Sequence, residues 1–155
     1  METKFQTIVE NLSEKDNLLV GDKDFFNEII SDEYLQCSVL GAITFSEMDF
    51  RGIDFTGSTF VNCVFKNCKF QDVILRKSDL TRSNFHQSIF RNSNFQNSTL
   101  RASDFSNFEF IETKFTNTNL ELLYVRSIKI LNANQCIEIK ESSNFEKILK
   151  DANLI

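Results

Sequence analysis

Residues 78–97 read SDLTR-SNFHQ-SIFRN-SNFQN, which is four five-residue units in succession. The third residue of each unit is Leu or Phe, and the register continues in both directions without an insertion. From 40 to 120, all seventeen positions divisible by five are Phe or Leu. Neither an α-helix nor an ordinary strand has a period of five, so the repeat itself must dictate the fold.

The other positions of the unit keep the same period. The residue two before each Phe or Leu is usually small, the residue directly before it is often Asp or Asn, and the two that follow are polar. This pattern resembles the pentapeptide-repeat family, whose motif reads small, Asp or Asn, Leu or Phe, polar, then Gly or Asn. The units 78–82, 83–87 and 93–97 are close matches, and the resemblance covers about two thirds of the chain.

The resemblance implies an all-β solenoid, a right-handed quadrilateral parallel β-helix of about five coils with short helical caps. The physical argument agrees, because a five-residue unit cannot bury its own apolar side chain and must stack on others. With twenty residues per coil, Phe45, Phe65, Phe85 and Phe105 form one column at the strand spacing of ~4.8 Å. The predicted structural core comprises Phe45, Phe50, Phe55, Phe60, Phe65, Phe70, Leu75, Leu80, Phe85, Phe90, Phe95, Leu100, Phe105, Phe110 and Phe115.

The chain divides into three predicted segments, because a solenoid needs caps over its apolar ends. Residues 1–34 are expected to be a mostly helical N-terminal cap, residues 35–134 the β-helix, and residues 135–155 a C-terminal strand and helix cap. Within the first segment, the pattern predicts a helix over 24–30 with Asp22 or Asp24 as its N-cap. Its apolar face would hold Phe25, Phe26, Ile29 and Ile30.

The C-terminal segment has two interpretations. Alternation over 136–139 predicts a last strand, and Ser142 or Ser143 would cap a helix over 145–150. The apolar residues of this segment either close their own rod or join a second copy, since members of the family dimerise end to end. The predicted dimer contacts are Phe145, Leu149, Leu154 and Ile155.

The charge is uneven along the chain. The formal net charge is −5, with −6 in residues 1–34, +2 in 35–134 and −1 in 135–155. Some relatives, the quinolone-resistance proteins, are thought to mimic duplex DNA and occupy type II topoisomerases, which requires a run of negative charge along the rod. The near-neutral rod makes this the alternative interpretation. Direct DNA binding is not expected, because no aromatic side chains are interleaved with the outward Lys and Arg residues.

The residue types do not indicate catalysis. His86 is the single histidine and follows a central Phe, so it should lie outside; no serine motif, Gly-rich phosphate loop or HExxH is present. Neither a metal nor a cofactor is expected. Cys63 and Cys68 occupy the small inward position and are expected to act as small hydrophobes, with a disulfide between adjacent sides left open. A cytoplasmic location is expected, because the sequence has neither a secretory signal nor an apolar run of membrane-spanning length.

Together these observations predict a non-catalytic scaffold or protein-interaction module whose flat faces bind an unidentified protein partner. The alternative is a DNA topoisomerase as partner, with the chain acting as a resistance or immunity factor. An enzyme is not supported. A fold alone does not name the partner.

Overall fold

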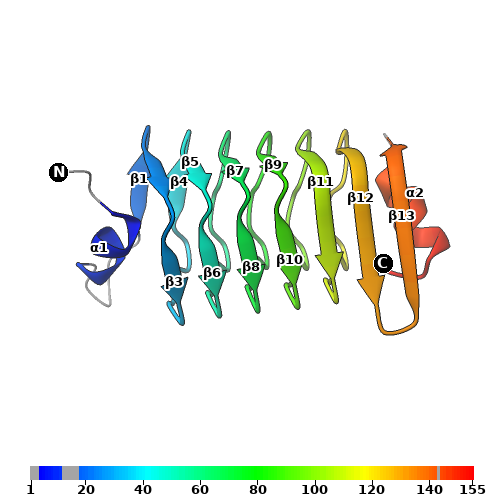
Figure 1. Cartoon of the computed structure of the whole chain (residues 1–155), viewed down its shortest axis with the longest axis horizontal. Coiled ribbons are helices and arrows are strands. Elements are labelled where there is room, and N and C mark those ends of the chain that lie inside the picture. The colour runs from blue at the N-terminus through cyan, green and yellow to red at the C-terminus, as the bar shows by residue number, and fades with distance from the viewer. Residues whose placement is uncertain (1–3, 12–17, 143) are drawn as a thin grey trace.

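The structure is a computed structural model that describes residues 4–11, 18–142 and 144–155. The described chain is a rod made of a parallel β-solenoid with a short helix at each end (Figure 1). Its short strands are β1 (Leu19–Gly21), β2 (Asp24–Phe26), β3 (Ile29–Ser31), β4 (Val39–Gly41), β5 (Thr44–Ser46), β6 (Asp49–Arg51), β7 (Val64–Lys66), β8 (Lys69–Gln71), β9 (Asn84–His86) and β10 (Ile89–Arg91). The longer strands are β11 (Asp104–Ile111), β12 (Tyr124–Asn132) and β13 (Gln135–Ser142), and the helices are α1 (Phe5–Glu10) and α2 (Phe145–Asp151).

Strand pairing shows that each turn of the solenoid takes twenty residues. Phe65 in β7 is the register partner of Phe45 in β5 and of Phe85 in β9, in parallel orientation. Two sides of the rod form one sheet of eleven strands in the described chain, because β11 spans a corner and pairs with both β9 and β10. The other two sides are held by β1 with β4 and by single bridges such as Tyr34 to Asp54, also twenty residues apart. Four five-residue sides therefore make one turn.

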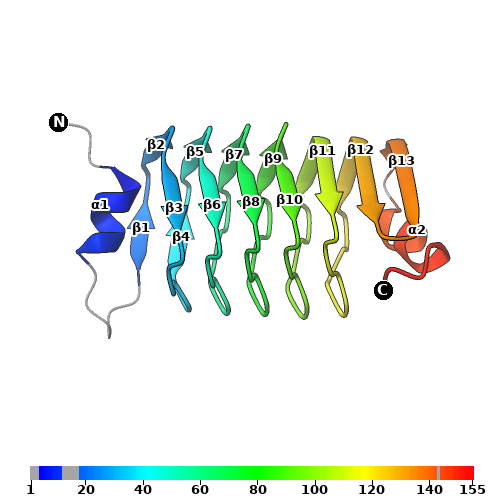
Figure 2. The same cartoon turned by 60° about the horizontal axis from the view of Figure 1, so that its bottom comes forward.

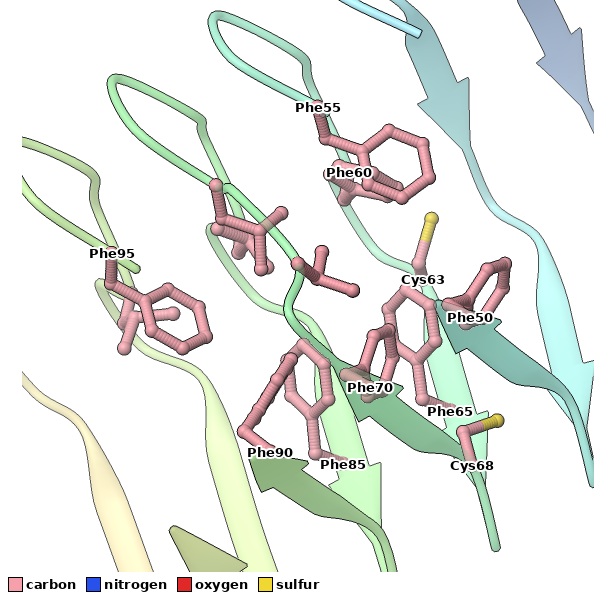
Figure 3. Packing of buried hydrophobic residues seen from close by; sticks show 14 of the residues in the cluster. Phe50, Phe55, Phe60, Cys63, Phe65, Cys68, Phe70, Phe85, Phe90 and Phe95 are labelled. Carbon is pink, nitrogen blue, oxygen red and sulfur yellow. The ribbon is translucent and has the colours of Figure 1, made fainter. Parts of the chain in front are cut away.

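The core consists of columns of inward side chains. The rings of Phe65 and Phe85 stack with centroids 4.7 Å apart and planes 7° from parallel (Figure 3). Phe85 stacks in turn on Phe105, at 4.5 Å and 3°. Neighbours within a turn meet edge to face instead, as Phe90 and Phe95 do at 4.8 Å and 85°. All fifteen residues of the predicted core are buried. Both ring geometries are favoured by the aromatic quadrupole.

A left-handed residue closes every corner. Each fifth residue from Asp22 to Ser127 has a positive φ, and it always lies two positions after the central apolar residue of its unit, which is mostly Phe or Leu. Glycine and asparagine adopt this conformation at the lowest cost, which explains their preference for the last position of the unit. At Gly52, with φ of +62°, an added Cβ would also approach Asp32 Oδ1 to 2.5 Å.

The solenoid begins earlier than predicted, and the helix predicted over 24–30 is wrong. Residues 24–26 and 29–31 are β2 and β3, and about six turns are present instead of five. Phe25 and Ile30 are buried, whereas Phe26 and Ile29 are 61% and 60% exposed. The four apolar residues fit one helical face, but 25 and 30 also continue the period of five, and stacking on the next turn decides the outcome.

The N-terminal cap is α1, which lies across the first turn (Figure 2). Its Phe5 ring meets the rings of Phe25 and Phe45 edge to face, at 5.0 and 5.4 Å. The buried carboxylate of Glu28 accepts hydrogen bonds from the backbone N–H groups of Phe5 and Gln6, both at 2.9 Å. Glu28 occupies the small inward position of its unit, so the first turn uses that position to hold the start of the cap.

The C-terminal end is closed by β13 and α2. β13 pairs antiparallel with β12, and α2 inserts Phe145 against Phe110 and Phe115 at centroid distances of 6.1 and 5.9 Å. The cap of α2 is Asn144, whose side chain accepts a hydrogen bond from the N–H of Lys147. The prediction of Ser142 as this cap is therefore wrong, and Ser143 lies outside the described residues. Asn144 takes the role because its oxygen reaches the N3 amide.

We expect Phe85→Ala to lower the free energy of unfolding by ~3–5 kcal/mol, because the ring is fully buried between Phe65 and Phe105 and its removal leaves a cavity. Arg91→Ala removes an exposed side chain on the next side and should change stability by no more than about 0.5 kcal/mol. Urea denaturation midpoints measure both. Equal midpoints would contradict the assignment of inward and outward positions.

Candidate functional site

The second inward position of each unit has a structural task that the sequence analysis missed. In several units a hydroxyl at this position donates a hydrogen bond to a central carbonyl of the preceding turn: Ser78 to Phe55 at 2.8 Å, and Ser103 to Leu80 at 2.6 Å. In others it donates within its own turn, as Ser98 does to the carbonyl of Phe95 at 2.6 Å. Ser58 in turn accepts a bond from the backbone N–H of Ser38. The recurrence of Ser and Thr at one period was the available signal. These hydroxyls are therefore bonded parts of the core and are not poised as nucleophiles.

The two inward cysteines follow the same rule. The Cys63 thiol donates to the carbonyl of Leu40 at 3.2 Å, and the Cys68 thiol to that of Phe45 at 3.4 Å. Both are free, and they occupy different corners of the turn (Figure 3). Burial raises the pKa of Cys63 to about 11 and that of Cys68 to about 12. Neither thiol supplies a thiolate near neutral pH, so neither is a reactive cysteine.

We expect two thiols to react rapidly with Ellman's reagent in the native protein at pH 8, namely exposed Cys37 and Cys136. Cys63 and Cys68 should react only after denaturation, because they are buried and protonated. The double substitution Cys37→Ser and Cys136→Ser should abolish the rapid phase. Rapid reaction of a third thiol in the native protein would show that an inward position is open.

Outward polar residues serve mainly the backbone of the rod. The Asp54 carboxylate accepts a hydrogen bond from the Thr56 N–H at 2.9 Å, whereas the carboxylate of Asp49 pairs with the Arg51 guanidinium. Partial burial alone would raise the pKa of Asp54, yet hydrogen bonds from Thr56 and Gln36, with the nearby charge of Arg76, hold that pKa below its ordinary value. These contacts stabilise turns and do not assemble an acid–base pair.

Neither His86 nor the outward amide side chains of the neighbouring corner form a reactive site. His86 is half-buried on the outer face of β9, between Lys66 and Ser106 in register. In the described chain, no cluster of three His, Cys, Asp or Glu side chains could hold a metal ion. Among the described residues, the side-chain amides of Asn67, Gln87 and Asn107 form no hydrogen bond with one another, and these three residues supply left-handed corners.

The charge of the rod reverses along its length. Residues 18–57 carry eight acidic and two basic side chains, a net charge of −6, whereas residues 58–97 carry two acidic and six basic ones, a net charge of +4. An acidic segment of the rod therefore lies directly beside a basic one. A charged partner protein would be steered toward the rod and oriented on it by this reversal of charge.

Three open hollows lie on or beside the side built from β3, β6, β8 and β10 to β12. Their volumes are about 600, 300 and 330 Å³. The largest is lined by β11, β12 and β13, the next by residues of β6, β8 and β10, and the third by the corner after β2 and β5. Their linings combine outward polar residues with buried ones such as Phe108, Phe70 and Met48. Such open hollows suit contact with another macromolecule better than enclosure of a small substrate.

The C-terminal residues predicted as dimer contacts are mostly used within the monomer. Phe145 and Leu149 are buried at 1% and 0% exposure, so they cannot contact a second copy, and that prediction is wrong for both. They point inward because the last turn exposes Phe110 and Phe115 unless a side chain covers them. Leu154 is half-buried against the core and Ile155 is 37% exposed. Only these last two remain available outside.

Four sides per turn, a central Phe or Leu on each side and a left-handed residue at each corner define the pentapeptide-repeat class of β-helices. The family described as pentapeptide repeat region matches residues 31–105 and 58–135, which together make up more than half of the chain. The chain belongs to this family. Among curated protein sequences, none matches it. In the described part of the chain, no helix is both long and apolar enough to cross a membrane.

Solved structures of the family share the fold. Rfr23 from the cyanobacterium Cyanothece 51142 has a TM-score of 0.54 and 13% identity, over 70% of this chain and 84% of Rfr23. HetL from Nostoc sp. strain PCC 7120, involved in heterocyst differentiation regulation, has a TM-score of 0.54 and 16% identity, over 82% of this chain. The match takes in 51% of HetL, so the chain spans about half the length of that relative. At such identities the likeness shows the fold alone.

A third structure is QnrB1 after trypsin treatment, a plasmid-mediated fluoroquinolone resistance protein. It is 16% identical to this chain, with 72% of this chain and 67% of QnrB1 covered. The TM-score is 0.23, so this likeness carries no argument about function.

Proposed function

We propose that this chain is a non-catalytic scaffold that binds a partner protein through the outward side chains of its rod. The proposal rests on one observation: in each unit the inward side chains and the backbone groups are used to hold the rod together. Inward apolar side chains fill the core, inward hydroxyls and thiols bond to backbone carbonyls, and backbone groups pair with adjacent turns. What remains for function is a firm exterior of flat sides whose charge reverses along the rod.

Catalysis finds little support in this exterior. His86 lies alone between Lys66 and Ser106, and the Asp54 carboxylate is held by Thr56 and Gln36. A general acid or base needs a second reacting group within hydrogen-bond reach, together with a site that shields substrate from water. We therefore place the function in recognition.

A cytoplasmic location goes with this proposal. All four cysteines are free, and Cys37 and Cys136 are exposed. In an oxidising compartment exposed thiols are prone to oxidation, whereas reducing compartments preserve them. Disulfide-linked forms of the protein in cells whose lysates are blocked with an alkylating agent would contradict this location.

A topoisomerase partner bound by DNA mimicry is the alternative, and the charge of the rod opposes it. A mimic of duplex DNA needs negative charge that continues along one face. Here residues 18–57 are acidic, but residues 58–97 carry a net charge of +4. The gyrase supercoiling assay separates the two interpretations: we expect no change in supercoiling and no relief of quinolone inhibition. Relief of inhibition would favour the alternative.

Photo-crosslinking tests the scaffold proposal directly. A photoreactive amino acid is placed at one outward position on each of the four sides, at Thr44, Gln71, Gln96 and Thr99, in cells of the source organism. We expect one or two sides to crosslink the same protein and the others to crosslink little, because a specific interface covers one part of a surface. Absence of any protein crosslink from all four sides would contradict the proposal.

A further inference from the structure

The first turn differs from the others on its outer surface. Each of its four sides exposes one large apolar side chain: Leu19 is 78% exposed, Phe26 61%, Ile29 60% and Tyr34 85%. In later turns most register partners of these residues are polar; Phe26, for example, is followed by Ser46, Lys66 and His86. Apolar side chains gathered at one end of a protein indicate an interaction surface.

Phe26 and Ile29 stand at the same corner, and a groove begins there. Phe26 ends β2, Ile29 begins β3, and only two residues separate them around the corner. The hollow of about 330 Å³ beside them is lined by Asn27, Glu28, Ile29, Glu47, Met48, Asp49, Asn67 and Lys69. We call Phe26, Ile29 and this hollow the N-terminal corner.

The N-terminal corner is acidic as well as apolar. The hollow is lined by three acidic residues, Glu28, Glu47 and Asp49, and by one basic residue, exposed Lys69. Glu47 is exposed on its wall, and exposed Asp24 lies outside the lining, two residues before Phe26 in β2. Among the described residues, no cation lies within ion-pair distance of either carboxylate, whereas Asp49 is neutralised by Arg51. The whole first turn, residues 18–37, has five acidic side chains against one basic one. A basic group on a partner would find unpaired carboxylates beside an apolar contact.

The same charges disfavour other occupants. A second copy joined at this corner would bring the acidic segments of both rods together, since a two-fold interface juxtaposes the same surface. Anionic lipid and nucleic acid would be repelled for the same reason. A protein segment with both basic and apolar side chains matches the corner in charge and in polarity.

We infer that the N-terminal corner docks a basic, apolar segment of a partner protein, an inference that rests on the proposed scaffold function. Phe26 and Ile29 contact the apolar side chains of that segment. Glu47 and Asp24 pair with its Lys or Arg side chains. The apolar pair supplies most of the affinity by leaving water, and the carboxylates set the orientation and the preference for a basic partner.

A labelled peptide of alternating Lys and Leu, titrated against the full chain by fluorescence anisotropy, tests the inference. The double substitution Phe26→Ser and Ile29→Ser should weaken binding at least about tenfold. Glu47→Gln should weaken it less and should reduce its dependence on salt. Because all three side chains lie outside the core, the variants should keep the thermal midpoint of the parent protein.

Matched controls use exposed apolar residues elsewhere on the rod. Ile74→Ser and Leu122→Ser should leave affinity within about twofold of the parent. Equal weakening by these controls, or equally tight binding of a peptide with Glu in place of Lys, would overturn the inference. Two further results would overturn it. One is a parent protein that self-associates and a Phe26 and Ile29 variant that does not, which would make a second copy the occupant. The other is binding of the parent protein to phosphatidylserine vesicles.

Failure of this inference is distinguishable from failure of the scaffold proposal. If a partner crosslinked from one side of the rod is still crosslinked after the Phe26 and Ile29 substitutions, the corner is not its docking site, while the scaffold function stands. If the crosslink disappears with those substitutions and survives Ile74→Ser, the corner is the docking site.

Discussion

Each inward side chain must fit beside the other inward side chains of its own turn and also stack on the one twenty residues away. The rod meets both demands because parallel backbone pairing fixes the register and a left-handed residue closes each corner. The rings of Phe65, Phe85 and Phe105 then lie nearly parallel along the rod. Serine hydroxyls can share the interior because they donate to backbone carbonyls, of the preceding turn at Ser78 and of the same turn at Ser98. The exterior inherits its flat sides from this regularity.

The period of five was enough to predict the solenoid and its core, since stacking of Phe and Leu depends only on spacing. It was not enough at the first turn, where Phe25, Phe26, Ile29 and Ile30 satisfy a helical face and two strands equally well. Tertiary stacking decides between them, and a local pattern carries no information about the turn above. The hydroxyl bonds were likewise missed, because smallness and bonding capacity both select serine.

Both ends show how apolar residues are divided between closure and recognition. Phe5 and Phe145 enter the interior and extend the aromatic core, so residues expected to join a second copy, such as Phe145, are used up within the monomer. Phe26 and Ile29 cannot do the same, because their strands already bury Phe25 and Ile30. The sequence alone could not tell the apolar residues that close the ends, Phe5 and Phe145, from the exposed ones, Phe26 and Ile29. Burial depends on which residue of each side faces inward.

The central claim is that a turn of twenty residues is the unit of stability. The most direct test compares the thermal unfolding midpoints of two insertion variants. Duplication of residues 78–97 adds one whole turn and keeps every column in register, so the midpoint should equal or exceed that of the parent. A single Ala inserted after Lys77 shifts every later inward residue by one position, so the midpoint should fall sharply or folding should fail. Equal midpoints for the two variants would contradict the account.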